Sequence, residues 1–184
     1  DICDKHQTML VVDECFLDFV KEPKKYSLKE ELSENPHLFL LKAFTKRYAM
    51  AGVRLGYGLC QNLDLLERMG RMTQPWNLSV IAQKAGIAAL KEEDYVRRGR
   101  QIVFQEIERM KQEFQKLGIK TYDSQANYLF FEGPKDLWEK CLDKGILIRD
   151  CSNYTGLSKG YYRVAVKMPQ ENDRLLKALG ELYL

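Results

Sequence analysis

Apolar runs predict three β-strands in the first 60 residues of the chain. The first run covers 8–12 and stops at Asp13 and Glu14, which is typical of a buried parallel strand with an acidic end. The runs 38–44 and 53–60 are strand-like as well. Because sites often form at the ends of such strands, Asp13 and Glu14 are the first candidates for chemistry.

The middle of the chain has the spacing of helices. The segments 62–72 and 77–91 each begin at a residue type that caps helices, and each places apolar residues on one face. A longer segment, 95–117, carries one continuous apolar stripe, formed by Val103, Ile107, Met110, Phe114 and Leu117. We expect one long helix here, ended by Gly118.

After this helix, short strand and helix patterns alternate. Strands are expected at 119–122, 127–131, 146–149 and 161–167, and helices at 135–143 and 169–182. This alternation predicts a small α/β layer of its own. We therefore place a domain boundary within the long helix, near Arg98, which divides the chain into domains 1–98 and 99–184.

The composition is that of a soluble globular protein long enough to bury a core. Of the 184 residues, 45% are hydrophobic and 30% are charged, and the formal net charge is +3. The basic residues are scattered among acidic ones, so nucleic acid is not indicated as a partner. No apolar run approaches the roughly 20 residues that a membrane span needs.

Cysteine usage bears on the compartment. The five cysteines include no CxxC pair and no spacing typical of metal ligands, so they are expected to be thiols of a reducing environment. The amino terminus lacks the charged and apolar layout of a signal peptide. We expect a cytoplasmic protein without a metal site.

Lys46 is the strongest candidate for catalysis. It follows an apolar strand and stands eight residues before Arg54. A desolvated lysine can form a Schiff base, although most loop lysines are simply solvated. A pyridoxal-phosphate site also needs a carboxylate for the ring nitrogen and guanidinium groups for anions, for which Asp13, Arg54, Arg149 and Arg163 are available. Taken singly, Asp13 is better explained as a cap or turn residue, and Arg149 and Arg163 as partners in surface ion pairs.

The chain resembles a known family in these same residues. The segment 13–19 resembles the strand-end motif of histidinol-phosphate aminotransferases and of the related L-threonine-O-3-phosphate decarboxylases. The segment 43–57 resembles their Schiff-base segment in order and spacing. The similarity continues through 74–77, 126–129, 146–151, 153–157 and 161–166, and so covers nearly the whole chain.

This resemblance implies an α/β fold and roles for individual residues. The domain 1–98 would be the carboxyl-terminal part of the family's major, mostly parallel cofactor-binding domain, and 99–184 its small α/β domain. Lys46 would form the covalent link to pyridoxal phosphate, Asp13 would pair with the ring nitrogen, and Arg54 would bind the phosphate with help from Thr45. The substrate, a phosphorylated amino acid, would be bound by Arg163, Arg149 and Asn127.

The resemblance leaves several alternatives open. Phe16 favours the decarboxylase, because most related aminotransferases have a tyrosine there whose hydroxyl bonds the cofactor. Ala43 replaces a hydroxyl residue common in relatives, which implies weaker phosphate binding. The family's chains are homodimers and contain a further half that completes the site. The alternatives are therefore a decarboxylase, a histidinol-phosphate aminotransferase, or a fragment that is inert by itself.

Overall fold

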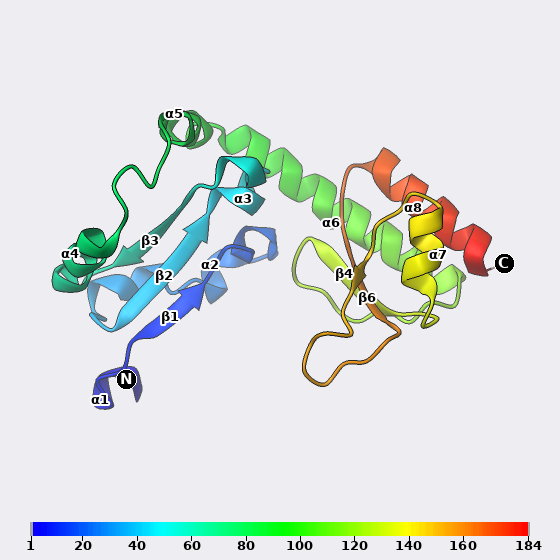
Figure 1. The fold of residues 1–184 in the computed structure, drawn as a ribbon, viewed down its shortest axis with the longest axis horizontal. Helices are drawn as coiled ribbons and strands as arrows, with labels where there is room; N and C mark the ends of the chain where they lie inside the picture. The colour runs from blue at the N-terminus through cyan, green and yellow to red at the C-terminus, as the bar shows by residue number, and fades with distance from the viewer. Residues whose placement is uncertain (1, 184) are drawn as a thin grey trace. The chain divides into compact units, whose positions relative to one another are not determined.

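The computed structural model describes residues 2–183, without the side chain of residue 4, and shows two compact units (Figure 1). The first unit ends at Arg97 and the second begins at Arg98. The division falls within α6 (Glu93–Lys116), the long helix drawn in green in Figure 1. Both units combine helices with a small sheet, as the expected α/β class requires.

The sheet of the first unit has three strands, in the order β1-β2-β3. Its strands are β1 (Leu10–Asp13), β2 (Leu38–Ala43) and β3 (Gly56–Cys60). β1 and β2 are parallel, with Asp13 opposite Leu41. β3 is antiparallel to β2, with Gly56 opposite Ala43. The parallel pairing that was expected for the first strand is therefore present, and the third strand reverses direction.

Burial in this sheet is concentrated on the central strand. Leu38, Phe39 and Leu40 of β2 are all buried. Gly58 lies against the Phe39 ring, where a Cβ atom would come within 2.3 Å of a ring carbon, so the glycine permits this close packing. β1 is not buried as expected, because Val11 is 58% exposed. An apolar run in the sequence predicts a strand, but it does not show which other element packs on that strand.

Short helices connect the strands of the first unit and longer ones follow them. They are α1 (Ile2–Lys5), η1 (Leu17–Phe19), α2 (Pro23–Tyr26), η2 (Lys29–Ser33), α3 (Phe44–Arg47), η3 (Ala51–Val53), α4 (Leu63–Met72) and α5 (Val80–Ala89). Asn62 caps α4 by accepting a hydrogen bond from the Leu65 N–H at 2.9 Å, as expected. The start of α5 was predicted wrongly at residue 77, since the structure uses Ser79 as the cap.

The second unit is a three-stranded antiparallel sheet with helices. Besides most of α6 it contains β4 (Tyr128–Glu132), α7 (Leu137–Asp143), β5 (Arg149–Asp150), β6 (Tyr161–Ala165) and α8 (Pro169–Tyr183). The strand order is β4-β6-β5. The expected strand 119–122 is wrong: this segment forms a single isolated bridge, between Thr121 and Phe131.

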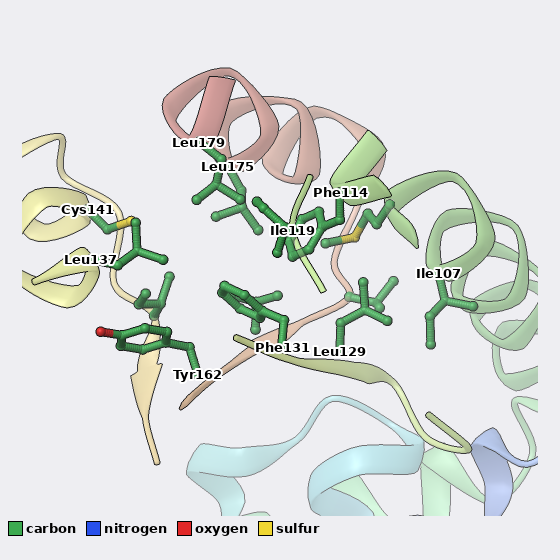
Figure 2. Close-up of a cluster of buried hydrophobic side chains, with 14 residues drawn as sticks. Ile107, Phe114, Ile119, Leu129, Phe131, Leu137, Cys141, Tyr162, Leu175 and Leu179 are labelled. Atoms are coloured by element: carbon green, nitrogen blue, oxygen red, sulfur yellow. The ribbon is translucent and has the colours of Figure 1, made fainter. Parts of the chain in front are cut away.

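Side chains from every part of the second unit form its core (Figure 2). Phe114 of α6 meets Phe131 of β4 edge to face, with ring centroids 5.1 Å apart. Leu179 of α8 and Tyr162 of β6 are also fully buried. The apolar stripe predicted along α6 therefore does face the core, and Gly118 follows the helix with a φ of 70°, the left-handed conformation expected at its end.

Two polar side chains, Asn172 and Glu106, are buried beside this core. Asn172 of α8 is 2% exposed, and its amide donates to Glu106 of α6 at 2.7 Å and to the Lys167 carbonyl at 2.9 Å. Its side-chain oxygen accepts from the Lys167 N–H at 3.0 Å. Arg109 forms an ion pair with the same Glu106 at 2.6 Å. These hydrogen bonds and this ion pair connect the first turn of α8 to α6.

Within residues 2–183, no helix combines the length and apolar character needed to cross a bilayer.

Candidate functional site

The four residues expected at the cofactor, Asp13, Thr45, Lys46 and Arg54, all lie at one end of the first sheet. Asp13 is the last residue of β1, and Lys46 lies in α3, which directly follows β2. Arg54 stands just before β3. Because β1 and β2 are parallel and β3 is antiparallel to them, the carboxyl ends of the first two strands and the amino end of the third share this edge.

Lys46 is held on a short helix by its neighbour Phe44. Phe44 is buried, and its ring stacks on the Tyr48 ring with the ring centroids 5.1 Å apart. The Phe44 N–H donates a hydrogen bond to the Leu55 carbonyl at 3.1 Å. Lys46 itself is exposed, and its Nζ lies 5.2 Å from the centroid of the Phe16 ring. In the described part of the chain it forms no ion pair. The helix that carries Lys46 is therefore anchored by Phe44, while the amine lies near the Phe16 ring without a counter-charge.

Asp13 is arranged to remain ionised. Its carboxylate accepts a hydrogen bond from the Cys15 N–H at 2.9 Å. Hydrogen bonding by the Cys15 side chain, and then by its backbone, lowers the pKa of Asp13. Burial and the neighbouring Asp13 together raise the pKa of the Cys15 thiol to about 11, so the thiol stays protonated and can donate. A carboxylate in this state suits a protonated ring nitrogen.

Arg54 has an unusual backbone conformation. Its φ of 56° and ψ of 50° place it in the left-handed region, which costs a non-glycine residue about 1 kcal/mol or more. Its Nη1 donates to the Ala51 carbonyl at 3.3 Å, and it has no carboxylate partner among residues 2–183. Thr45, expected to assist, is half-buried beside Lys46 in α3. An exposed guanidinium without a counter-charge is suited to a phosphate.

The sequence drew attention to Glu14 beside Asp13 but did not reveal its structural role. Its side chain is buried, 4% exposed, and accepts hydrogen bonds from the Ser27 hydroxyl and the Leu28 N–H. It also forms an ion pair with Lys42 of β2 at 2.6 Å. Despite its burial, these partners lower the pKa of Glu14. The only sequence signal was its place after Asp13, where alternating side chains of a strand point to opposite faces.

A cavity of about 330 Å³ lies close to these residues. It is lined by Glu14, Cys15, Lys42, Phe44, Arg47 and Tyr57, among others. Lys46, Asp13 and Arg54 do not line it. The cavity is therefore separate from the group of residues expected at the cofactor.

Two arginines of the second unit lie side by side. Arg149 of β5 is directly opposite Arg163 of β6 in the antiparallel register. Tyr162 and Val164 of β6 are buried, so Arg163 belongs to the opposite face, away from the core. Adjacent like charges across a strand pair are unfavourable without an anion. Neither arginine forms an ion pair with any carboxylate that the structure describes.

Polar and aromatic groups orient these two arginines. Arg149 donates from Nη2 to the Asn153 side-chain oxygen at 3.0 Å, and its guanidinium lies 5.7 Å from the Tyr154 ring. The Arg163 guanidinium lies 4.8 Å from the Tyr128 ring. Such stacking holds a guanidinium while leaving its N–H groups free to bind an anion.

Asn127, the third residue expected at the substrate, stands immediately before β4. It is half-buried, and its carbonyl accepts from the Val166 N–H at 2.9 Å. The following residue, Tyr128, is the one that stacks on Arg163. The structure thus groups the cofactor candidates within the first unit and the substrate candidates within the second.

The donor set of the first unit fits pyridoxal phosphate. The cofactor requires an amine for its aldehyde, an ionised carboxylate for its ring nitrogen and a cation for its phosphate. Lys46, Asp13 and Arg54 provide one of each at the same sheet edge. Groups of three or more histidine, cysteine or acidic side chains suited to a metal ion are absent from the described residues.

Comparisons with known proteins identify the family of the chain. Residues 1–179 match the model of the family "Aminotransferase class I and II". The chain is 36% identical over 183 residues to the threonine-phosphate decarboxylase of Salmonella typhimurium, covering 97% of this chain and 50% of that protein. It is 35% identical over 178 residues to the histidinol-phosphate aminotransferase of Desulfitobacterium hafniense, covering 95% and 48%.

A solved structure shows the same fold. The histidinol-phosphate aminotransferase of Clostridium acetobutylicum superposes with a TM-score of 0.90 at 28% identity, covering 97% of this chain and 55% of that one. The chain spans about half the length of the curated relatives it matches. Pyridoxal phosphate is the cofactor of this group of enzymes. The match over residues 1–179, together with the fold, establishes that the chain belongs to the aminotransferase class I and II family.

Proposed function

We propose that this chain is part of a pyridoxal-phosphate enzyme that acts on a phosphorylated amino acid. The observation that carries the proposal is the grouping of Lys46, the ionised Asp13 and Arg54 at one edge of the first sheet. The cofactor domain would be 1–98 and the small domain 99–184. We further propose a homodimeric, cytoplasmic protein, in line with the sequence expectations.

Each residue of the first unit has a distinct task in this proposal. When bound, the cofactor supplies a ring that accepts electrons from the substrate's α-carbon. Asp13 holds a proton at the ring nitrogen, because its lowered pKa keeps it charged. Arg54 binds the phosphate. Lys46 moves a proton to or from the α-carbon as a general acid and base.

The arginines of the second unit would bind the substrate. A phosphorylated amino acid carries a carboxylate and a phosphate, and Arg163 and Arg149 offer two adjacent guanidinium groups for two anions. Asn127 would add an amide. The position of the substrate decides the reaction, because the α-carbon bond perpendicular to the ring is the one that breaks.

Decarboxylation of L-threonine O-3-phosphate is the favoured reaction. Phe16 lies beside Lys46 and has no hydroxyl with which to bond the cofactor. The relative in Salmonella typhimurium, a threonine-phosphate decarboxylase, supports this choice. The second candidate is histidinol-phosphate aminotransferase, which the similarly close relative in Desulfitobacterium hafniense supports.

Product analysis of the whole protein tests these candidates. Carbon dioxide released from L-threonine O-3-phosphate, and lost in Lys46→Ala, supports the decarboxylase. Transfer of the amino group of histidinol phosphate to 2-oxoglutarate, also lost in that variant, supports the aminotransferase instead. Absence of both reactions in a preparation that contains the family's remaining half contradicts the proposal.

A further inference from the structure

Two ion pairs join the segment that carries Asp13 to the segment that carries Lys46. Glu14 pairs with Lys42, and Asp18 pairs with Arg47. The members of each pair are 28 and 29 residues apart in the sequence, so both pairs depend on the tertiary fold. Lys46, in the second of these segments, also lies over the Phe16 ring of the first.

The first pair is anchored at the sheet. The Glu14 N–H donates to the Leu41 carbonyl at 3.0 Å, which continues the pairing of β1 with β2 by one residue. Its buried carboxylate then lies 2.6 Å from the Lys42 Nζ and also holds the Ser27 hydroxyl. A charge pair with several hydrogen bonds in a buried place is rigid, because each group is costly to leave unpaired.

The second pair lies directly beside the amine. Arg47 follows Lys46 in α3, and Asp18 follows Phe16 by two residues in η1. Arg47 donates to Asp18, and its guanidinium also lies 5.3 Å from the Tyr48 ring. The pair thus connects α3 to η1 beside the contact between Lys46 and Phe16.

We propose that Glu14, Lys42, Asp18 and Arg47 are positioning residues that hold Lys46 in a fixed place relative to Phe16 and Asp13. This inference rests on the proposed function for its purpose, although the position of Lys46 is measurable without the cofactor. Exposed ion pairs contribute little, but these two are partly or largely buried and join separate segments. A reactive amine needs such support, since a displacement of about 1 Å can reduce a rate by about a hundredfold.

Asp18→Asn is the sharpest variant, because it removes the charge pair without altering α3. Asp18→Glu, unlike Asp18→Asn, keeps a carboxylate at this position. Arg47→Lys keeps the positive charge but loses the planar guanidinium that can bind a carboxylate through two N–H groups. The matched control is Glu67→Gln, which breaks the exposed pair between Glu67 and Arg71 within α4. Thermal unfolding of each variant separates a loss of stability from a loss of position.

Two readouts are made on the full chain. The first is pH-dependent labelling of Lys46 by acetic anhydride without cofactor, normalised to the exposed Lys24 in the same sample. Release from the Phe16 ring is expected to raise relative labelling about two- to fivefold in Asp18→Asn. The second is the rate at which added pyridoxal phosphate forms a borohydride-reducible adduct at Lys46, expected to fall about tenfold or more.

The two readouts distinguish this inference from the proposed function. Changed labelling in Asp18→Asn, recovered in Asp18→Glu and absent in Glu67→Gln, supports positioning even if no adduct forms, in which case the proposed function fails. If Asp18→Asn and Glu67→Gln form the Lys46 adduct at equal rates and show equal labelling of Lys46, the positioning role is overturned. The proposed function then still stands, because the adduct forms. An Asp18→Asn protein that is merely less stable, with unchanged labelling, overturns it as well.

Discussion

At the residue scale, the pattern of charges says more than any single side chain. Lys46, Arg54, Arg149 and Arg163 are cations without a carboxylate partner in the described part of the chain, while most other charged contacts there are ordinary pairs. Arg149 and Arg163 lie opposite each other across a strand pair, where like charges are unfavourable unless an anion is bound. The phosphate and carboxylate groups of a cofactor and a substrate would serve as these anions.

Arg54→Ala should weaken binding of pyridoxal phosphate. Loss of hydrogen bonds to a charged group costs about 1.5–3 kcal/mol, which is about a tenfold to hundredfold rise in the dissociation constant. Arg54→Lys should recover only part of the affinity, because it keeps the charge but not the bidentate geometry. Absorbance titration measures both, and an unchanged affinity in Arg54→Ala would remove Arg54 from the phosphate site.

The element scale shows which parts of the fold the sequence predicts. Helix α4 and the long helix α6 were predicted because a cap and an apolar stripe are local signals. The segment 119–122 has the composition of a strand but pairs only at Thr121, since Ile119 turns into the core directly after Gly118.

Glu14→Gln should loosen the connection between β1 and β2. Removing one partner of a buried ion pair costs about 3 kcal/mol, because Lys42 is left partly buried and unpaired. The pKa of Glu14 is lower in the folded protein than the value of about 4.3 in the unfolded chain. The ionised Glu14 therefore stabilises the fold fully at pH values above about 4.3, and this stabilisation is lost as the pH falls through the folded-state pKa. Chemical denaturation should therefore show a gap between wild type and variant at pH 7 that narrows below about pH 4. A difference in free energy of unfolding that stays the same at both pH values would contradict the role of ionised Glu14 in this ion pair.

Asn172→Ala should destabilise the second unit. The change removes the Asn172 hydrogen bond to Glu106, which keeps only Arg109, and removes the side chain that pairs with the Lys167 N–H and carbonyl, which costs about 1–3 kcal/mol. Gln170→Ala, at an exposed position of the same helix, is the matched control and should change stability by less than about 0.5 kcal/mol. Equal denaturation midpoints for the two variants would show that the buried network contributes nothing.

For the molecule as a whole, the two units differ in how completely they bury their cores. All the residues of the second unit's cluster come from Ile107 onward, and six of them are fully shielded from solvent. In the first unit, buried apolar residues are concentrated in β2 and α5, and β1 presents Val11 to solvent. The sequence could not reveal this difference, because periodicity does not show what a face packs against.

The second unit should therefore fold by itself. A fragment of residues 93–184 contains α6 and every member of the core cluster. We expect a cooperative thermal transition and dispersed amide resonances from it. A fragment with helical circular dichroism but no cooperative transition would show that its core needs the first unit.

The candidate cofactor site was proposed from the sequence through resemblance more than through pattern. Asp13, Lys46 and Arg54 follow one another along the chain in the order seen in the family that the sequence resembles. Their assembly at one sheet edge depends on the direction of β3, which periodicity does not specify. The pairs Glu14–Lys42 and Asp18–Arg47 had no local signal, because their partners lie far apart in the chain. Ion pairs of this kind become visible only once the register of the strands is known.

The central claim is that Lys46 is the residue that holds pyridoxal phosphate. The most direct test is borohydride reduction of the protein with one equivalent of cofactor, followed by peptide mapping, with Lys46→Ala and Lys24→Ala compared. The account predicts a single modified site at Lys46, lost in the first variant and retained in the second. Modification spread over many lysines, or unchanged in Lys46→Ala, would contradict it.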